Sequence, residues 1–141
     1  MAKERATRFT VSLPNSLMAV LDRLQAERGY TNRSEFVRDL LRAELVKQEW
    51  EGQAGETVAV LVIVYEHDLR ALADKLTDIQ HHSHGTITAT LHLHLDEHTC
   101  LEVIPLRGPA KHVRQVANRI LSTKGVRYGR LVPATTGKGL S

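Results

Sequence analysis

Hydrophobic and polar residues alternate near the start of the chain, over residues 8–13. Successive side chains of a β-strand point to opposite sides, so Phe9, Val11 and Leu13 would share one face and the polar residues between them the other. The pattern predicts one short strand after a polar N-terminal tail.

Two stretches with helical spacing of apolar residues follow this strand. The first begins after Pro14 and Asn15, which are typical of a helix start, and stops at Gly29. The second begins after Asn32, which we expect to cap it, and continues to about Lys47. The apolar positions are Leu17, Val20, Leu21 and Leu24 in the first helix, and Phe36, Val37, Leu40, Leu41 and Leu45 in the second.

This N-terminal unit, residues 1–50, contains a strand that has no partner. A lone strand leaves backbone groups unpaired, so we expect two copies to pair their strands as an antiparallel ribbon. The polar face of such a ribbon fits the DNA major groove, where Arg reads guanine and Thr or Ser contacts bases. The candidate base-reading residues are Arg8, Thr10 and Ser12, with a solvated strand face as the alternative.

The start of the second helix offers a further candidate contact with DNA. Asn32, Arg33 and Ser34 lie where the helix dipole and free backbone amides favour a phosphate. Helix capping alone is the competing interpretation.

The remainder of the chain alternates between strand and helix patterns. The polar segment at residues 51–56 is typical of a linker, and residues 133–141 are expected to form a loose tail. Between them we expect strands over 57–65, 86–95, 100–106 and 126–132, with helices over 69–79 and 109–121. The order βαββαβ is that of the split βαβ sandwich, so residues 57–132 should form an α+β domain with two helices on one face of a four-stranded sheet.

Composition and charge narrow the function only slightly. The 141 residues fit one medium domain or two small ones, and the net charge of +3 with a pI near 9.2 only weakly favours a nucleic-acid partner. No apolar run approaches the roughly 18 residues that a membrane span needs, so we expect a cytoplasmic protein without a membrane partner. The single cysteine, Cys100, excludes an internal disulfide.

Histidines are concentrated around this cysteine. Seven of the eight lie between His67 and His98, and residues 1–50 contain none. His92 and His94 are two apart on a predicted strand, so both imidazoles would leave one face, roughly 7 Å apart. If residues 95–99 form a hairpin loop, Cys100 lies opposite His94 on that same face.

The other face of this strand carries Leu91, Leu93 and Leu95. We expect these leucines to pack against the helices, which would turn the histidine face away from the core of the domain.

Two imidazoles and a thiolate suit Zn, Cu(II), Co and Ni, and exclude Mg and Ca, which prefer oxygen ligands. A fourth ligand could come from the histidine run at residues 80–84 or from a second subunit. One alternative is that solvent-exposed strand and turn histidines simply coincide with a buried cysteine. Another is a cysteine nucleophile with His94 or His98 as its base, although no orienting group is evident.

The chain resembles the nickel-responsive transcriptional regulators (NikR) over nearly its whole length. The motifs RFTVSL, RGYTNRSEFVRDLLR, YEH, QHHSHG and LHLHLDEHTCLE occur in the expected order. The resemblance implies an N-terminal ribbon-helix-helix domain and a C-terminal ferredoxin-like, ACT-like domain, assembled as a homotetramer (a dimer of dimers). It also implies one Ni(II) per subunit, in a square plane.

The resemblance assigns roles to individual residues. The implied nickel ligands are His92, His94 and Cys100 of one subunit and His81 of a neighbouring subunit. The same resemblance matches Glu35 and Asp39 to a second, weaker cation site, and Arg70 to a residue that approaches DNA. Leu69 stands where some relatives carry lysine, and Ser83 interrupts the histidine run.

The sequence therefore predicts a nickel-responsive, sequence-specific DNA-binding regulator and not an enzyme. We expect a Ni(II)-dependent repressor of nickel uptake genes that binds a palindromic operator, with no further protein partner implied. The alternative is a ribbon-helix-helix regulator that senses an amino acid or another metal, such as Cu, Zn or Co, through its ACT-like domain.

Overall fold

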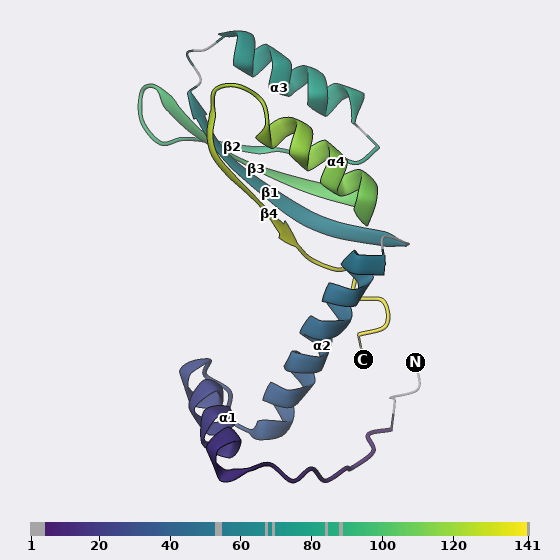
Figure 1. Ribbon diagram of the computed structural model, residues 1–141. Helices are drawn as coiled ribbons and strands as arrows, with labels where there is room; N and C mark the ends of the chain where they lie inside the picture. Colours follow the sequence, from purple (N-terminus) through teal and green to yellow (C-terminus); the bar gives the residue numbers. More distant parts are fainter. Residues whose placement is uncertain are drawn as a thin grey trace. The chain divides into compact units, whose positions relative to one another are not determined.

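The computed structural model describes residues 5–52, 55–66, 68, 70–83, 85–87 and 89–140. The chain divides into two compact units, an N-terminal unit of Met1–Leu45 with Gly139–Ser141 and a C-terminal unit of Val46–Lys138. The elements are α1 (Asn15–Glu27), α2 (Arg33–Gly52), β1 (Glu56–Glu66), α3 (Arg70–His82), β2 (Leu91–His94), β3 (Thr99–Pro109), α4 (Ala110–Leu121) and β4 (Val126–Pro133) (Figure 1).

Both helices of the N-terminal unit begin where the sequence predicts. Pro14 precedes α1, and its carbonyl accepts the first helical hydrogen bond, from the backbone N–H of Met18 (2.9 Å). Gly29 follows α1 with φ of 75°, a conformation that glycine adopts without steric cost. Asn32 caps α2 as predicted, because its side-chain oxygen accepts the backbone N–H of Glu35 at 2.9 Å.

The strand expected over residues 8–13 is not formed in the single chain. Residues 5–14 have no regular secondary structure and run as an irregular trace to the start of α1 (Figure 1). A strand needs a hydrogen-bonded neighbour, and the described part of one chain offers none. The apolar side of this segment is consequently uncovered, with Phe9 73% and Val11 63% exposed.

The N-terminal unit has almost no core of its own. Among its described residues Phe36 alone is buried, where it packs beside the ring of Tyr30. Five apolar residues of its helices are exposed: Leu17, Val20, Leu40, Leu41 and Leu45. Burial of apolar surface is the main driving force of folding, so this unit requires a further surface to cover it.

The C-terminal unit confirms the predicted order βαββαβ. Its four strands form an antiparallel sheet in the order β2-β3-β1-β4, and α3 and α4 cover one face (Figure 1). Alternate residues of the two central strands point toward the helices and form the core. The core residues of these strands include Ala59, Leu61, Ile63, Tyr65, Cys100, Ile104 and Leu106.

The second strand of this unit is shorter than predicted. β2 spans only Leu91–His94, whereas the sequence suggests a strand from residue 86 to residue 95. A turn takes up the start of that stretch, because the carbonyl of Ser83 accepts the backbone N–H groups of Thr86 (2.7 Å) and Ile87 (2.8 Å). Ile87 makes an isolated bridge to β3, and regular pairing begins at Leu91.

The predicted beginnings of the linker and of the tail are also corrected. α2 continues through Gly52, so the first two residues of the expected linker are helical. The reason is Trp50, which is 2% exposed and belongs to the core of the C-terminal unit. Its indole N–H donates to the carbonyl of Ala134 at 2.8 Å, and Ala134 in turn donates its backbone N–H to Val58. The beginning of the expected loose tail is therefore fixed.

The exchange of Trp50 for Ala should destabilise the C-terminal unit. The substitution removes a buried ring and leaves a cavity, which typically costs about 3–5 kcal/mol of unfolding free energy. Urea denaturation followed by circular dichroism measures this change. Gln48→Ala, at an exposed position of the same helix, should change the unfolding free energy by less than about 0.5 kcal/mol. Equal stabilities for the two variants would mean that the indole is not part of the core.

Candidate metal centre

Two adjacent strands bring the predicted ligands together. β2 pairs with β3 so that His94 lies opposite Cys100 and His92 lies opposite Glu102. The predicted register between His94 and Cys100 is therefore confirmed.

Asp96 fixes the hairpin that sets this register. Its carboxylate oxygen accepts the backbone N–H groups of His98 (2.8 Å) and Thr99 (2.7 Å), and these bonds hold the pKa of Asp96 below its usual value. Leu95 adds a backbone bond, from its N–H to the carbonyl of Thr99 at 2.8 Å. The loop is therefore tied by side-chain and backbone bonds together.

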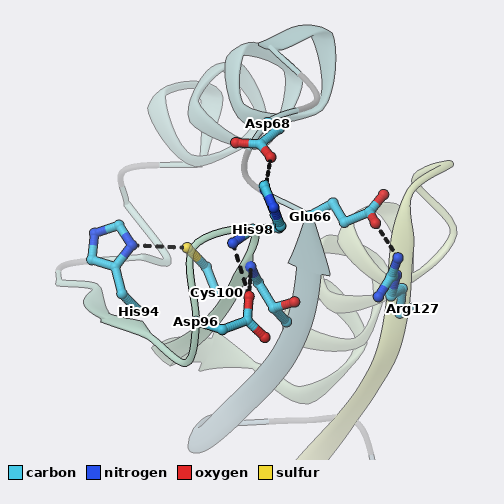
Figure 2. Close-up of polar contacts among 8 residues, drawn as sticks. Glu66, Asp68, His94, Asp96, His98, Cys100 and Arg127 are labelled. Atoms are coloured by element: carbon cyan, nitrogen blue, oxygen red, sulfur yellow. Dashed lines mark hydrogen bonds and ion pairs between the residues drawn. The ribbon is translucent and has the colours of Figure 1, made fainter.

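The donor atoms of the three side chains lie within 4.8 Å of one another. The Nε2 atom of His92 is 3.1 Å from the sulfur of Cys100, and the Nδ1 atom of His94 is 3.5 Å from it. Figure 2 shows the ring of His94 turned toward this sulfur. Among the residues that the structure describes, no other group of three or more His, Cys, Asp or Glu side chains converges in this way.

The face on which these ligands lie differs from the expectation. Cys100 is 0% exposed and points into the core beneath the helices, so the paired histidines are on the helix-covered side of the sheet. They remain exposed because β2 is the edge strand. Leu91, Leu93 and Leu95, expected to pack against the helices, are instead exposed.

Four residues to which the sequence assigned no individual role complete the surroundings of the ligands. The hydroxyl of Tyr65 lies 3.4 Å from Nδ1 of His92. The buried carboxylate of Glu102 accepts a hydrogen bond from the amide of Gln80 (3.0 Å), and Gln80 accepts one from the hydroxyl of Thr90 (3.1 Å). A charged residue at an inward position of a buried strand is the signal that could have identified Glu102.

The electrostatic environment favours a bound cation. Burial raises the pKa of the Cys100 thiol, and the carboxylates of Glu102, Asp96 and Asp68 raise it further. Burial likewise raises the pKa of Tyr65, with Glu102 adding to the effect. A divalent metal would displace the thiol proton and offset the negative charge nearby, and two imidazoles with a thiolate suit nickel and its neighbours among the metals.

The other histidines that the structure describes do not join this cluster. His81 is exposed in the last turn of α3, and the neighbouring His82 contacts the backbone carbonyl of Asp78 through Nδ1 at 2.9 Å. His98 is paired with Asp68 at the other side of the hairpin (Figure 2). His67 and His84 lie outside the described residues.

The candidate DNA-reading residues Arg8, Thr10 and Ser12 are all exposed in the segment before α1. At the start of α2, two of the three candidate phosphate contacts already have hydrogen-bond partners. Arg33 makes two hydrogen bonds with Asp22, at 2.8 and 2.9 Å, and Asn32 is engaged as the helix cap. Ser34 is exposed. Arg70 is the first residue of α3, but its side chain is not among the described parts of the structure. Leu69 lies outside the described residues.

The predicted second cation site consists of two carboxylates that already have partners. Glu35 pairs with Arg38 at 2.6 Å. Asp39 accepts hydrogen bonds from the hydroxyl of Tyr30 (2.7 Å) and from Arg42 (2.8 Å), and the pKa of Asp39 is lowered, first by Tyr30 and then by Arg42. A cation site here stays a prediction, and it would have to compete with these arginines.

Comparison with known proteins matches each of the two units to a protein family. Residues 58–134 match the family described as the NikR C terminal nickel binding domain, and residues 7–48 match the ribbon-helix-helix protein, copG family. A relative in Geobacter metallireducens named nickel-responsive regulator is 49% identical over 133 residues, which are 94% of this chain and 96% of the relative. A relative of the same name in Nitratidesulfovibrio vulgaris (strain DSM 19637 / Miyazaki F) is 49% identical over 137 residues, or 97% and 99% of the two chains.

The solved structure of an uncharacterized protein from Thermotoga maritima is similar in fold. It aligns with a TM-score of 0.52 and 17% identity over 57% of this chain and 100% of that chain. Together with the paired His92, His94 and Cys100, the matches to both domains show that the chain belongs to the NikR family of nickel-responsive, ribbon-helix-helix transcriptional regulators.

Proposed function

We propose that this protein is a Ni(II)-dependent repressor of nickel uptake genes that acts in the cytoplasm, where its DNA lies. The observation that carries the proposal is the cluster of His92, His94 and Cys100 in the same chain as a ribbon-helix-helix domain. Such a chain joins a metal sensor to a DNA reader. No helix in the described part of the chain has the length and apolar character to cross a membrane.

The proposed nickel site holds one ion per subunit. His92, His94 and Cys100 supply three donors from one chain, and we assign the fourth to His81 of a second copy. The position of the histidines on the edge strand supports this, because both imidazoles are exposed there and within reach of another chain. Bound nickel would link two subunits through a planar set of three nitrogens and one sulfur.

We propose a dimer of dimers because the chain presents two separate apolar surfaces. The first consists of the exposed apolar residues of the N-terminal unit, including Phe9 and Val11. The second lies on the face of the sheet opposite the helices, where the exposed residues include Leu91, Leu93, Leu95, Tyr128 and Val132. Exposed apolar surfaces of this kind mark interfaces, and two closed contacts per chain give a tetramer.

The proposed DNA contact follows from pairing of the first surface. Two copies of residues 8–13 would form a ribbon with Phe9 and Val11 against the helices and the polar residues toward the major groove. A symmetric protein reads a symmetric site, so the operator should be a palindrome whose half-sites lie an integral number of helical turns apart.

Nickel would act on DNA binding through linkage. A site shared between subunits binds metal tightly only in one arrangement of the subunits, so the metal favours that arrangement. If this arrangement spaces the two ribbons to match the half-sites, nickel strengthens operator binding. Operator binding must then strengthen nickel binding by the same factor.

Selection from a random-sequence duplex library tests this function directly. The full-length protein is incubated with the library with and without Ni(II), and bound duplexes are sequenced over several rounds. A palindrome enriched only with Ni(II) supports the proposal. Enrichment that is independent of metal, or that occurs only without it, would rule out a nickel-dependent repressor.

The nickel site should fail when its thiolate is removed. Cys100→Ser should weaken Ni(II) binding, because a serine hydroxyl keeps its proton and is a poor metal ligand. Loss of a residue that only hydrogen-bonds to a metal ligand costs up to about 100-fold in affinity, so loss of the ligand itself should cost more than about 100-fold. Isothermal calorimetry measures the affinity, and circular dichroism verifies folding. The control His112→Ala, outside the cluster on α4, should bind nickel like the unmodified protein.

Mixed oligomers test whether the site is shared between chains. His81→Ala should also abolish tight nickel binding, but mixing it with Cys100→Ser under subunit exchange should restore part of the sites. Each restored site would combine three ligands of the first variant with the histidine of the second. Verified mixed oligomers that recover no nickel binding would exclude His81 as a ligand from a second copy.

The ribbon should read bases through Arg8. Arg8→Ala should weaken binding to the selected palindrome by about 1–3 kcal/mol while leaving nickel affinity unchanged. Arg23→Ala, exposed on α1, is the matched control and should have a smaller effect. Fluorescence anisotropy with the palindrome and with random duplex separates two roles. An equal weakening on both duplexes would assign Arg8 to phosphates and refute direct readout.

A further inference from the structure

Acidic and basic residues are unevenly distributed along the chain. Residues 103–141 contain eight Lys and Arg residues and no Asp or Glu, whereas residues 51–102 contain two Lys and Arg against nine Asp and Glu. The modest net charge of +3 therefore conceals a strongly basic C-terminal segment, which includes α4 and β4.

The helix α4 displays part of this charge on its outer face. Its apolar residues are used in the core: Ala110, Val113, Val116, Ala117 and Ile120 are all buried. Its exposed residues are Lys111, His112, Arg114, Gln115, Asn118 and Arg119, and the exposed Ser122 and Lys124 follow in the next turn. Nearly all of these are side-chain types that commonly contact DNA phosphates, and none is acidic.

Some of the basic residues in this segment are already engaged. Arg114 lies over the ring of Trp50 at 5.5 Å, and Arg107 and Arg127 are paired with glutamates of β1. In contrast, Lys111, Arg119 and Lys124 make no ion pair with any acidic side chain in the described part of the chain. We call these three residues, of which Lys124 lies just beyond the end of the helix, the α4 basic face.

The chemistry of the α4 basic face distinguishes among possible partners. The centres of protein interfaces are depleted in Lys and enriched in aromatic residues, and no large apolar side chain is exposed on α4. A helix that binds a membrane surface inserts its apolar side, but that side of α4 is buried in the core. A surface of cations and neutral hydrogen-bonding groups fits a polyanion that is bound without sequence readout.

We propose that Lys111, Arg119 and Lys124 bind the phosphate backbone of DNA, as a sequence-independent contact in addition to the ribbon. The proposal rests on the proposed function, since it takes DNA as the polyanion. The ribbon then selects the sequence, and the α4 basic face adds affinity that depends on salt and not on sequence.

A triple variant tests this contact. Lys111→Gln, Arg119→Gln and Lys124→Gln are combined in the full-length protein, and binding is measured with the selected palindrome and with random duplex over a salt series. We expect the slope of log affinity against log salt to fall by about 1 for each phosphate that the variant no longer neutralises. Affinity for both duplexes should fall by the same factor, roughly 10-fold, while nickel affinity is unchanged.

The matched control removes the same charge elsewhere. Lys47→Gln, Lys75→Gln and Lys138→Gln are combined at three exposed positions outside the α4 basic face. This control should keep a salt slope close to that of the unmodified protein. Equal slopes for the two triple variants would assign the effect to net charge, and an unchanged slope for the α4 variant would leave the face to solvent or to another partner; either result overturns the proposal.

Failure of the proposed function would be recognised separately. An unmodified protein with no nickel-dependent preference for any duplex contradicts the repressor, but the random-duplex measurement still decides the role of the α4 basic face. Conversely, a nickel-dependent palindrome with an unaltered salt slope in the α4 variant contradicts this inference alone.

Discussion

The pairing of β2 with β3 is the constraint on which the metal centre depends. Side chains alternate along a strand, so a shift of one residue would turn both His92 and His94 to the face opposite Cys100. The hairpin prevents this shift through the hydrogen bonds that Asp96 accepts from the backbone N–H groups of His98 and Thr99. The burial of Cys100 in the core then fixes the side of the sheet on which the histidines lie.

Each unit of the chain is incomplete in a different way. The N-terminal unit lacks a strand partner and a cover for its apolar residues, and the metal cluster has three donors in the described chain where a planar site needs four. In the proposed tetramer both deficiencies are met by other copies of the chain. Metal binding and assembly are then coupled by one free energy, so any contact that stabilises the tetramer also raises the affinity for nickel.

Local patterns explain which features were predictable from the sequence. The Asn32 cap and the pairing of His94 with Cys100 depend on a few neighbouring residues and a short loop, and both are confirmed. The orientation of β2 was predicted wrongly, because alternation defines two faces of a strand but does not tell which one the helices cover. That choice is set by the inward residues of β3.

Local sequence patterns could not predict contacts between distant parts of the chain. Trp50 bonds to a carbonyl 84 positions away, so nothing in the polar sequence around it indicated that α2 would continue into the predicted linker. The environment of the metal ligands likewise combines Tyr65 of β1, Gln80 of α3 and Glu102 of β3. Their convergence is a property of the assembled sheet and helices.

The distribution of charge gives a physical reason for placing a cation site and a DNA reader in one chain. Residues 51–102, which hold all four proposed ligands, are strongly acidic and would repel DNA when metal is absent. A Ni(II) ion that replaces one thiol proton raises the charge of each site by one unit. In a tetramer this change occurs four times, and it lowers the repulsion of DNA by the acidic segment while leaving the α4 basic face unaltered. Electrostatics therefore acts in the same direction as the geometric linkage between nickel and operator binding.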